Sequence, residues 1–344
     1  MGWRGRVSQA RYDFASDNVA GAMPEAIEAL VAANEGAASG YGTDTISARA
    51  ADLIRELLDA DAEVRFVASG TAANALSLAC LAQPHEAVLA HAHAHVCTDE
   101  TGAPGFFGAG VGLIPLSGES GRIDAKGLIE ALAHPDVSYR QAPAALSLTN
   151  ATEYGTVYSE AQARALIKPV KAAGYGVHLD GARLAGAAAA GFGLKTIARS
   201  GVDILVMGGT KAGSTPSEAI VLFDRKLAHR FDARLKHAGQ LVSKGRFRAA
   251  PWLGLLGEGV PWLKRAHHAN DMAKRLAELM PFPIIHPVEA NGLFVDMDET
   301  ALYRLREAGW FVYRFLDGTV RFMCSWATTP EMVDELGEAL RAIR

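Results

Sequence analysis

Residues 204–211 read Ile204-Leu205-Val206-Met207-Gly208-Gly209-Thr210-Lys211, an apolar run that stops in two glycines and then offers a lysine. The apolar run predicts a buried β-strand of a largely parallel sheet. A lysine directly after such a strand lies in a cleft rather than in solvent. Because burial disfavours an ammonium ion, Lys211 is a candidate for the neutral amine that forms a Schiff base with an aldehyde.

A second strand end lies upstream and reads Val177-His178-Leu179-Asp180-Gly181-Ala182-Arg183. In open α/β sheets, ligands bind outside the carboxyl ends of the strands, so we expect Asp180 and Lys211 to share one site. Pyridoxal phosphate enzymes use a lysine for the cofactor's aldehyde and a carboxylate beside its pyridine nitrogen. The two strand ends together predict a pyridoxal phosphate enzyme.

Composition narrows the class of protein further. The chain has 344 residues, with 34 basic and 38 acidic side chains and a net charge of −4, which argues against nucleic acid or an anionic membrane as the main partner. No apolar run has membrane-spanning length, and the N-terminus lacks the apolar stretch of a signal peptide. The cysteines Cys80, Cys97 and Cys324 are few and scattered. We therefore expect a cytoplasmic protein with reduced cysteines.

The pattern along the chain predicts a large α/β domain followed by a smaller α+β domain. Apolar segments bounded by turn residues predict strands at Val64–Val67, Ala87–Ala90, Gly112–Leu116, Ala145–Leu148, Val177–Leu179, Ile204–Met207 and Ala219–Phe223. Helical segments separate several of them, at Pro24–Val31, Ser47–Leu58, a stretch ending at Leu81, and Ser159–Ala173. A long helix after Pro261, strands at Gly292–Met297, Phe311–Phe315 and Val320–Cys324, and a helix at Thr329–Ile343 complete the pattern. We expect an N-terminal segment (1–19), a cofactor-binding domain (20–245) and a small C-terminal domain (246–344).

Five motifs in this order resemble the threonine aldolase family, within the fold type I pyridoxal phosphate enzymes. They are Ser16-Asp17-Asn18, Ser69-Gly70-Thr71-Ala72-Ala73-Asn74, His95 with Asp99-Glu100-Thr101-Gly102-Ala103, His178-Leu179-Asp180-Gly181-Ala182-Arg183, and Gly209-Thr210-Lys211. The resemblance implies a three-layer α/β/α large domain with a smaller C-terminal α+β domain. It also implies reversible cleavage of L-threonine, L-allo-threonine or related L-β-hydroxy-α-amino acids, such as L-phenylserine, to glycine and an aldehyde.

The resemblance assigns roles around the cofactor ring. Lys211 would hold pyridoxal phosphate covalently, and Asp180 would keep its pyridine nitrogen protonated. Arg183 would reach the phenolate oxygen or the substrate carboxylate. His95, five residues before Glu100, would stack on the ring, and we consider it a candidate base for the substrate's β-hydroxyl.

The cofactor phosphate is expected at the start of the helix that Gly70 and Thr71 open, where free backbone N–H groups favour an anion. The family resemblance implies further basic side chains from a neighbouring subunit. Lys236 and Lys244 are candidates, although their basic segment could equally be a solvated face. We therefore expect a homodimer or homotetramer with active sites at the subunit interface.

The resemblance also suggests how the substrate is held. Ser16 and Arg321 would bind its carboxylate, with the planar guanidinium supplying a bidentate pairing. Glu153 stands where some members of the family have a histidine beside the β-substituent. It is either a buried base or a loop carboxylate, which leaves the base and the selectivity for the β-substituent open.

Three histidines at alternate positions raise the question of a metal. On a strand, His91, His93 and His95 would point to one face, and imidazole is a common zinc ligand. The alternative is that His91 and His93 are strand or loop neighbours of His95. Nothing nearby supplies a convincing acidic or thiolate complement, so we expect no metal.

Two other classes of function remain open from the sequence. A β-eliminating lyase, or less readily an aminotransferase, would use the same scaffold and cofactor. A protein that binds pyridoxal phosphate without catalysis belongs to a different class, and the joint presence of Lys211, Asp180 and Arg321 argues against it.

Overall fold

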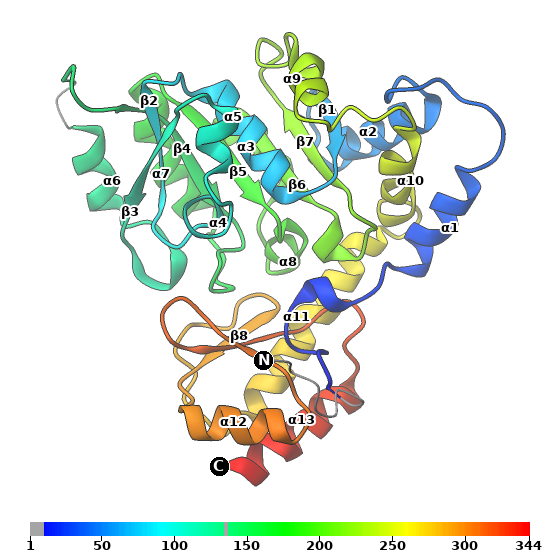
Figure 1. Cartoon of the computed structure of the whole chain (residues 1–344), viewed down its shortest axis with the longest axis vertical. Helices are drawn as coiled ribbons and strands as arrows, with labels where there is room; N and C mark the ends of the chain where they lie inside the picture. The colour runs from blue at the N-terminus through cyan, green and yellow to red at the C-terminus, as the bar shows by residue number, and fades with distance from the viewer. Residues whose placement is uncertain (1–9, 134–136) are drawn as a thin grey trace, which may run out of the picture.

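The large part of the molecule is built on a seven-stranded sheet (Figure 1). The structure is a computed structural model that describes residues 10–133 and 137–344. The sheet order is β1-β7-β6-β5-β4-β2-β3. The strands are β1 (Glu63–Val67), β2 (Glu86–His91), β3 (Gly112–Leu116), β4 (Ala142–Thr149), β5 (Gly176–Gly181), β6 (Ile204–Gly208) and β7 (Glu218–Leu222). The predicted α/β fold is confirmed, and the sheet is mixed because β7 runs antiparallel to both of its neighbours, β1 and β6.

Alternation along β6 explains the three layers. Leu205 and Met207 belong to a core shared with α2 (Thr45–Leu58), α7 (Glu160–Ala172) and α10 (Arg246–Leu255). Ile204 and Val206 belong to a second core, shared with α3 (Gly70–Leu81) and α9 (Phe231–His237). Successive side chains of a strand point to opposite faces, so an entirely apolar strand requires helices on both sides.

The other helices of the large part are shorter or lie at its edges. They are α1 (Pro24–Ala32), α4 (His95–Thr98), α5 (Ala103–Phe107), α6 (Ala125–Leu132) and α8 (Leu184–Ala189). Single 3₁₀ turns are η1 (Asp17–Val19), η2 (Glu119–Gly121), η3 (Leu194–Thr196), η4 (Ala198–Ser200) and η5 (Thr210–Ala212). Of these turns, η1 and η5 contact each other, which brings the N-terminal segment against the loop that carries Lys211.

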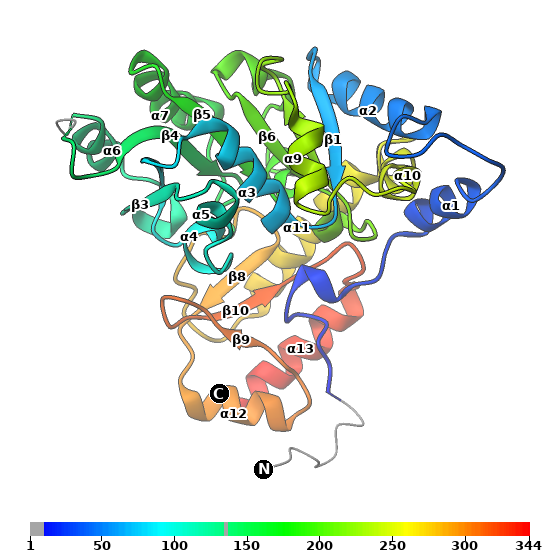
Figure 2. The ribbon, with the colours of Figure 1, turned by 45° about the horizontal axis from the view of Figure 1, so that its top comes forward.

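A smaller α+β unit lies below the large sheet (Figure 2). Its three-stranded sheet has the order β8-β10-β9. Its elements are α11 (Pro261–Leu279), β8 (Gly292–Val295), α12 (Glu299–Glu307), β9 (Tyr313–Arg314), β10 (Val320–Met323) and α13 (Pro330–Ile343). Phe14 of the N-terminal segment is buried in the core of this unit, so the start of the chain is tied to its C-terminal part.

The packing of α10 bears on the proposed domain division. This helix contacts α1 and α2, and its Trp252 lies in the core of the large sheet together with Trp262 from the start of α11. A boundary at residue 245 therefore separates α10 from the helices that it contacts, and the division stays a prediction. The first nine residues of the predicted N-terminal segment lie outside the described residues. Among the described helices, none is both long and apolar enough to cross a membrane.

Candidate active site

Lys211 lies in η5, immediately beyond the carboxyl end of β6. The glycines before it are required by close approach: a Cβ on Gly208 would lie 2.2 Å from the Ala182 carbonyl oxygen, and one on Gly209 would lie 2.3 Å from that of Ser217. The Gly209 N–H donates to Glu218 Oε2 at 2.7 Å. The loop is thus clamped between its neighbours, so the origin of the lysine side chain is fixed.

Asp180 lies at the carboxyl end of β5, the strand next to β6. Its carboxylate accepts two hydrogen bonds, from the Ala182 N–H to Oδ1 at 3.0 Å and from Asn74 Nδ2 to Oδ2 at 3.0 Å. Val177 and Leu179 on the same strand point into the core on the opposite face. The alternating sequence of β5 therefore turns Asp180 toward α3, where Asn74 lies.

His95 begins α4 and is held by Glu100, whose Oε1 lies 2.8 Å from His95 Nδ1. The hydrogen bond to Glu100 raises the pKa of His95, while burial opposes this and the negative charge of Glu153 adds to it. The same Glu100 oxygen accepts a hydrogen bond from Asn74 at 2.8 Å. His95 and Asp180 are therefore joined through two side chains, Glu100 and Asn74.

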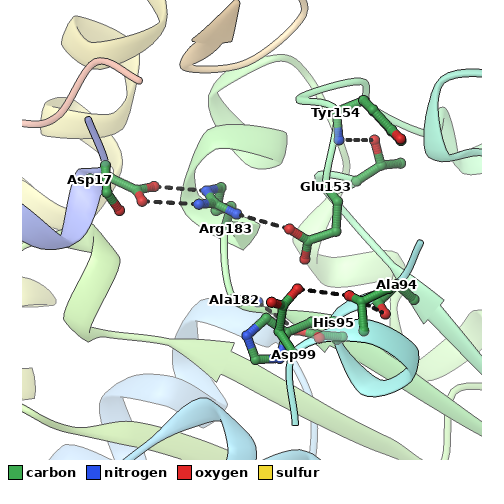
Figure 3. A network of polar contacts seen from close by, with 12 residues as sticks. Asp17, Ala94, His95, Asp99, Glu153, Tyr154, Ala182 and Arg183 are labelled. Atoms are coloured by element: carbon green, nitrogen blue, oxygen red, sulfur yellow. Dashed lines mark hydrogen bonds and ion pairs between the residues drawn. The ribbon is translucent and has the colours of Figure 1, made fainter. Parts of the chain in front are cut away.

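An ion-pair group joins η1, the residue that precedes α8 and the loop after β4 (Figure 3). Arg183 donates to both carboxylate oxygens of Asp17, at 2.7 Å from Nε and 3.0 Å from Nη2. Its Nη1 lies 3.8 Å from Glu153 Oε2. The Arg183, Asp17 and Glu153 side chains are all at least nine-tenths buried. The Arg183 guanidinium, which the sequence predicted to bind the cofactor or the substrate, therefore lies beside two carboxylates, Asp17 and Glu153.

Asp17 is expected to make the folded state sensitive to acid. Burial alone would raise the pKa of Asp17, but the pair with Arg183 lowers it to about 2. An unfolded aspartate titrates near roughly 3.9, so the pair stabilises the folded state fully above about pH 4, and this contribution is lost as the pH falls toward about 2. We expect Asp17→Asn to lower the free energy of unfolding by about 2–3 kcal/mol near neutral pH, measured by urea unfolding.

The difference between Asp17→Asn and the parent should shrink as the pH falls below about 4. Asp334→Asn is a matched control, because Asp334 also pairs with an arginine, Arg275, but both side chains are nearly half exposed. Exposed pairs contribute little, so we expect no measurable change for this variant. A penalty for Asp17→Asn that is independent of pH would contradict the assignment.

Arg321 lies on β10 between the buried residues Val320 and Phe322. Burial lowers the pKa of Arg321 and the charge of Arg183 lowers it further, whereas Asp17 raises it, so the two arginines face the same region. Its Nε is buried without a hydrogen-bond partner among the described residues. An orphaned guanidinium N–H is costly unless a ligand satisfies it, and a carboxylate would do so.

Gly70 and Thr71 form the first turn of α3, capped by the Ser69 side chain, which accepts from the Ala72 N–H. A Cβ added to Gly70 would meet nothing within 4 Å. Open space in front of free N–H groups at the start of a helix suits a phosphate. The location of the cofactor phosphate at this helix start stays a prediction.

Three predicted residues remain: Ser16, Lys236 and Lys244. The Ser16 hydroxyl accepts from the Asn18 N–H at 3.2 Å and caps η1, which contacts η5. Lys236, on α9, lies over the Tyr41 ring at 4.8 Å. Lys244 is exposed. The described contacts do not bring either lysine to the site within one chain, so both remain candidates for a neighbouring subunit.

The three histidines do not lie on one strand. β2 ends at His91, and a turn follows in which the His93 N–H donates to His91 Nδ1 at 3.1 Å. His93 Nδ1 lies 2.5 Å from the Tyr154 hydroxyl, whereas His95 starts α4. The three side chains therefore engage different partners rather than lining one face.

Sequence reasoning gave no role to several residues of the site. Asp17, Asn74 and Glu100 stand inside motifs that the sequence made visible, and Glu218 does not. For Asp17, Asn74 and Glu100, the signal that could have indicated a role is a charged or amide side chain within an otherwise apolar or glycine-rich motif. Burial raises the pKa of Glu218, and the nearby charge of Lys211 opposes this.

The residues present fit pyridoxal phosphate. Lys211 offers an amine and Asp180 a doubly hydrogen-bonded carboxylate, while the α3 N-terminus offers an open anion cradle and Arg321 an unsatisfied N–H. A small pocket beside Lys211 is also lined by Arg183 and Asp17. This arrangement is that of a cofactor-dependent enzyme of the fold type I class.

Comparison with known proteins identifies the family. Residues 13–300 match the family described as Beta-eliminating lyase, so the chain belongs to the beta-eliminating lyase family. Within that family it is 45% identical over 340 residues to the low specificity L-threonine aldolase of a Pseudomonas species, covering 96% of this chain and 97% of that protein. The resemblance to threonine aldolases is thereby confirmed.

Solved structures agree with this placement. Threonine aldolase from Leishmania major superposes with a TM-score of 0.91 at 28% identity, covering 97% of this chain and 100% of the other. N-succinyldiaminopimelate aminotransferase from Mycobacterium tuberculosis superposes with a TM-score of 0.71 at 17% identity, covering 94% and 91%. The second likeness shows the shared fold alone.

Proposed function

We propose that this protein is a pyridoxal phosphate-dependent L-threonine aldolase. It cleaves L-threonine, L-allo-threonine or related L-β-hydroxy-α-amino acids, such as L-phenylserine, reversibly to glycine and an aldehyde. The observation that carries the proposal is the placement of Lys211 and Asp180 at the carboxyl ends of adjacent strands. The 45% identity to a low specificity L-threonine aldolase supports the reaction type.

Pyridoxal phosphate, when bound, supplies an electron sink for cleavage of the bond between Cα and Cβ. In this proposal, Lys211 supplies the amine that holds the cofactor, and the N–H groups of Gly70 and Thr71 bind the phosphate. Asp180 holds the proton of the pyridine nitrogen, and its two hydrogen bonds keep the carboxylate oriented. His95 covers one face of the ring and takes the proton of the β-hydroxyl.

The substrate carboxylate is proposed to bind chiefly to Arg321. Its buried Nε has no partner among the described residues, whereas Nε and Nη2 of Arg183 already donate to Asp17. Arg183 can then contribute through Nη1, the atom that faces Glu153. Ser16 and Glu153 complete the substrate region, with Glu153 beside the β-substituent.

Assembly and location belong to the same proposal. We propose a homodimer or homotetramer in which Lys236 or Lys244 of one subunit approaches the phosphate bound by another. The α3 N-terminus, with open space before Gly70, leaves room for such a contact. A cytoplasmic location is proposed as well, and it is supported by three free cysteines among the described residues.

Aldehyde release from L-threonine and L-phenylserine, with added pyridoxal phosphate, tests the proposal. We expect glycine and aldehyde in equal amounts, because the reaction breaks only the bond between Cα and Cβ. Ammonia and a keto acid without aldehyde would instead assign the chain to elimination, the reaction that the family's description names. Cofactor binding without any turnover would indicate a non-catalytic protein.

A further inference from the structure

The side chain of Asn74 lies between two buried carboxylates. It projects from α3, and its Nδ2 donates to Glu100 Oε1 at 2.8 Å and to Asp180 Oδ2 at 3.0 Å. Asn74, Glu100 and Asp180 are 2%, 3% and 1% exposed. An amide nitrogen carries two hydrogens, so both donors of Asn74 are used by acidic groups.

Glu100 extends the chain of contacts to the ring-face histidine. Its Oε1 also lies 2.8 Å from His95 Nδ1, so one oxygen receives both Asn74 and His95. Glu100 Oε2 and Asn74 Oδ1 are buried without hydrogen-bond partners among the described residues. A continuous path therefore runs from Asp180 through Asn74 and Glu100 to His95, and its two ends are the residues proposed at the pyridine nitrogen and at the ring face.

The path of hydrogen bonds places a donor between two buried carboxylates, Glu100 and Asp180. Two buried carboxylates that face each other cannot both ionise readily unless donors lie between them. Burial raises the pKa of Glu100 and the charge of Asp180 raises it further, whereas the hydrogen bonds with His95 and Asn74 lower it. The charged groups that act on His95 are Glu100 and Glu153, which raise its pKa, and Lys211, which lowers it.

We propose that Asn74 and Glu100 are positioning residues that couple the two protein contacts of the cofactor ring. Asn74 allows Asp180 and Glu100 to remain ionised side by side. Glu100 accepts the Nδ1–H of His95, which leaves Nε2 as the acceptor for the proton of the substrate's β-hydroxyl. The inference rests on the proposed function for the identity of the ligands, but its tests do not require turnover.

The variant Glu100→Gln tests the link to His95. Glutamine keeps an oxygen that can accept from Asn74 and His95, and it removes the negative charge. We expect the pKa of His95 to fall, measured by histidine NMR titration of the apo protein and assigned with His95→Gln. If aldolase activity is present, a base that works in its neutral form should gain activity at lower pH, so the acidic limb of kcat/KM should move down. An unchanged titration of His95 would overturn this link.

The pair Asn74→Leu and Asn74→Leu/Glu100→Gln tests the bridge. Leucine has nearly the shape of asparagine without its donors, so Glu100 and Asp180 would face each other unseparated. We expect the dissociation constant for pyridoxal phosphate, measured by spectroscopic titration of the apo protein, to rise by about tenfold or more in the single variant. Removing one of the two charges should then recover most of the loss in the double variant.

A merely structural role predicts a different outcome. If Asn74 only filled space, the two substitutions would be additive and the double variant would bind the cofactor no better than Asn74→Leu, which would overturn the proposal. Asn270→Leu is the control, because Asn270 is equally buried but donates to the Gly186 carbonyl. It should show no recovery when combined with Glu100→Gln. Cofactor binding without threonine cleavage would count against the proposed reaction. The coupling between Asp180 and His95 could still be measured by cofactor binding and by the His95 titration.

Discussion

Lys211→Ala is expected to lower kcat for aldehyde release by at least about 10³-fold, because covalent catalysis and the associated proton transfer both depend on this amine. The close contacts at Gly208 and Gly209 fix the backbone from which the Lys211 side chain projects. Borohydride reduction of the parent protein with cofactor should leave a stable mass addition on the peptide that contains Lys211. The variant should lack that addition while retaining non-covalent cofactor binding.

The matched control for this variant is Lys126→Ala. Lys126 lies on α6 with 84% of its side chain exposed, so its removal tests for general effects of losing a lysine. We expect its kcat to stay within about twofold of the parent, because surface substitutions rarely alter structure. Cofactor mass on a different lysine, or full activity of Lys211→Ala, would refute the assignment.

The sequence predicted that Asp180 and Lys211 lie at the ends of neighbouring strands because the signals for both strands are local. An apolar run followed by glycines and a lysine predicted the end of β6, and the short apolar segment Val177–Leu179 predicted β5. Both predictions depend on residues adjacent in the chain, where strand periodicity acts directly. The three-layer arrangement that the family resemblance implied agrees with the strand pattern, since an all-apolar strand must be covered on both faces.

The contacts that the sequence did not predict are those between distant segments. Asp17 and Arg183 lie 166 positions apart, and no periodicity relates them. Sequence reasoning therefore gave the carboxylate-binding role to Ser16 and left Asp17 without a function. A buried arginine needs a partner, but only the approach of η1 to η5 and α8 shows which one.

Short elements were the other source of error. The predicted strand Phe311–Phe315 is reduced to β9 (Tyr313–Arg314), because only these two residues pair with β10. The strand ending at His91 gives way to a turn stabilised by the His91 ring itself. Side chain-to-backbone hydrogen bonds of this kind override an alternating pattern, which is why three histidines at strand spacing do not share a face.

The path from Asp180 to His95 depends both on local sequence motifs and on the packing of the fold. Each member stands in a motif that was visible in the sequence, but the motifs come from three different segments. The fold brings them together because α3 crosses the sheet beside β5, with the start of α4 close by. Local pattern therefore selected the residues, and the packing of α3 determined which of them touch.

Asp180→Asn should be the second most damaging substitution, lowering kcat by about 10²–10³-fold, as expected when a charged group that stabilises the reacting state is lost. Asparagine can still accept from the Ala182 N–H, but its own N–H₂ must then meet the donor of Asn74, and no negative charge remains to hold the proton on the pyridine nitrogen. Steady-state aldehyde release measures the loss.

Asp203→Asn is the control, because Asp203 precedes β6 at the opposite edge of the same sheet and accepts from the Val177 N–H and Lys171. Since ligands bind at the carboxyl edge, we expect near-parental kcat for Asp203→Asn, and equal losses in both variants would mean that Asp180 acts through stability rather than through the cofactor.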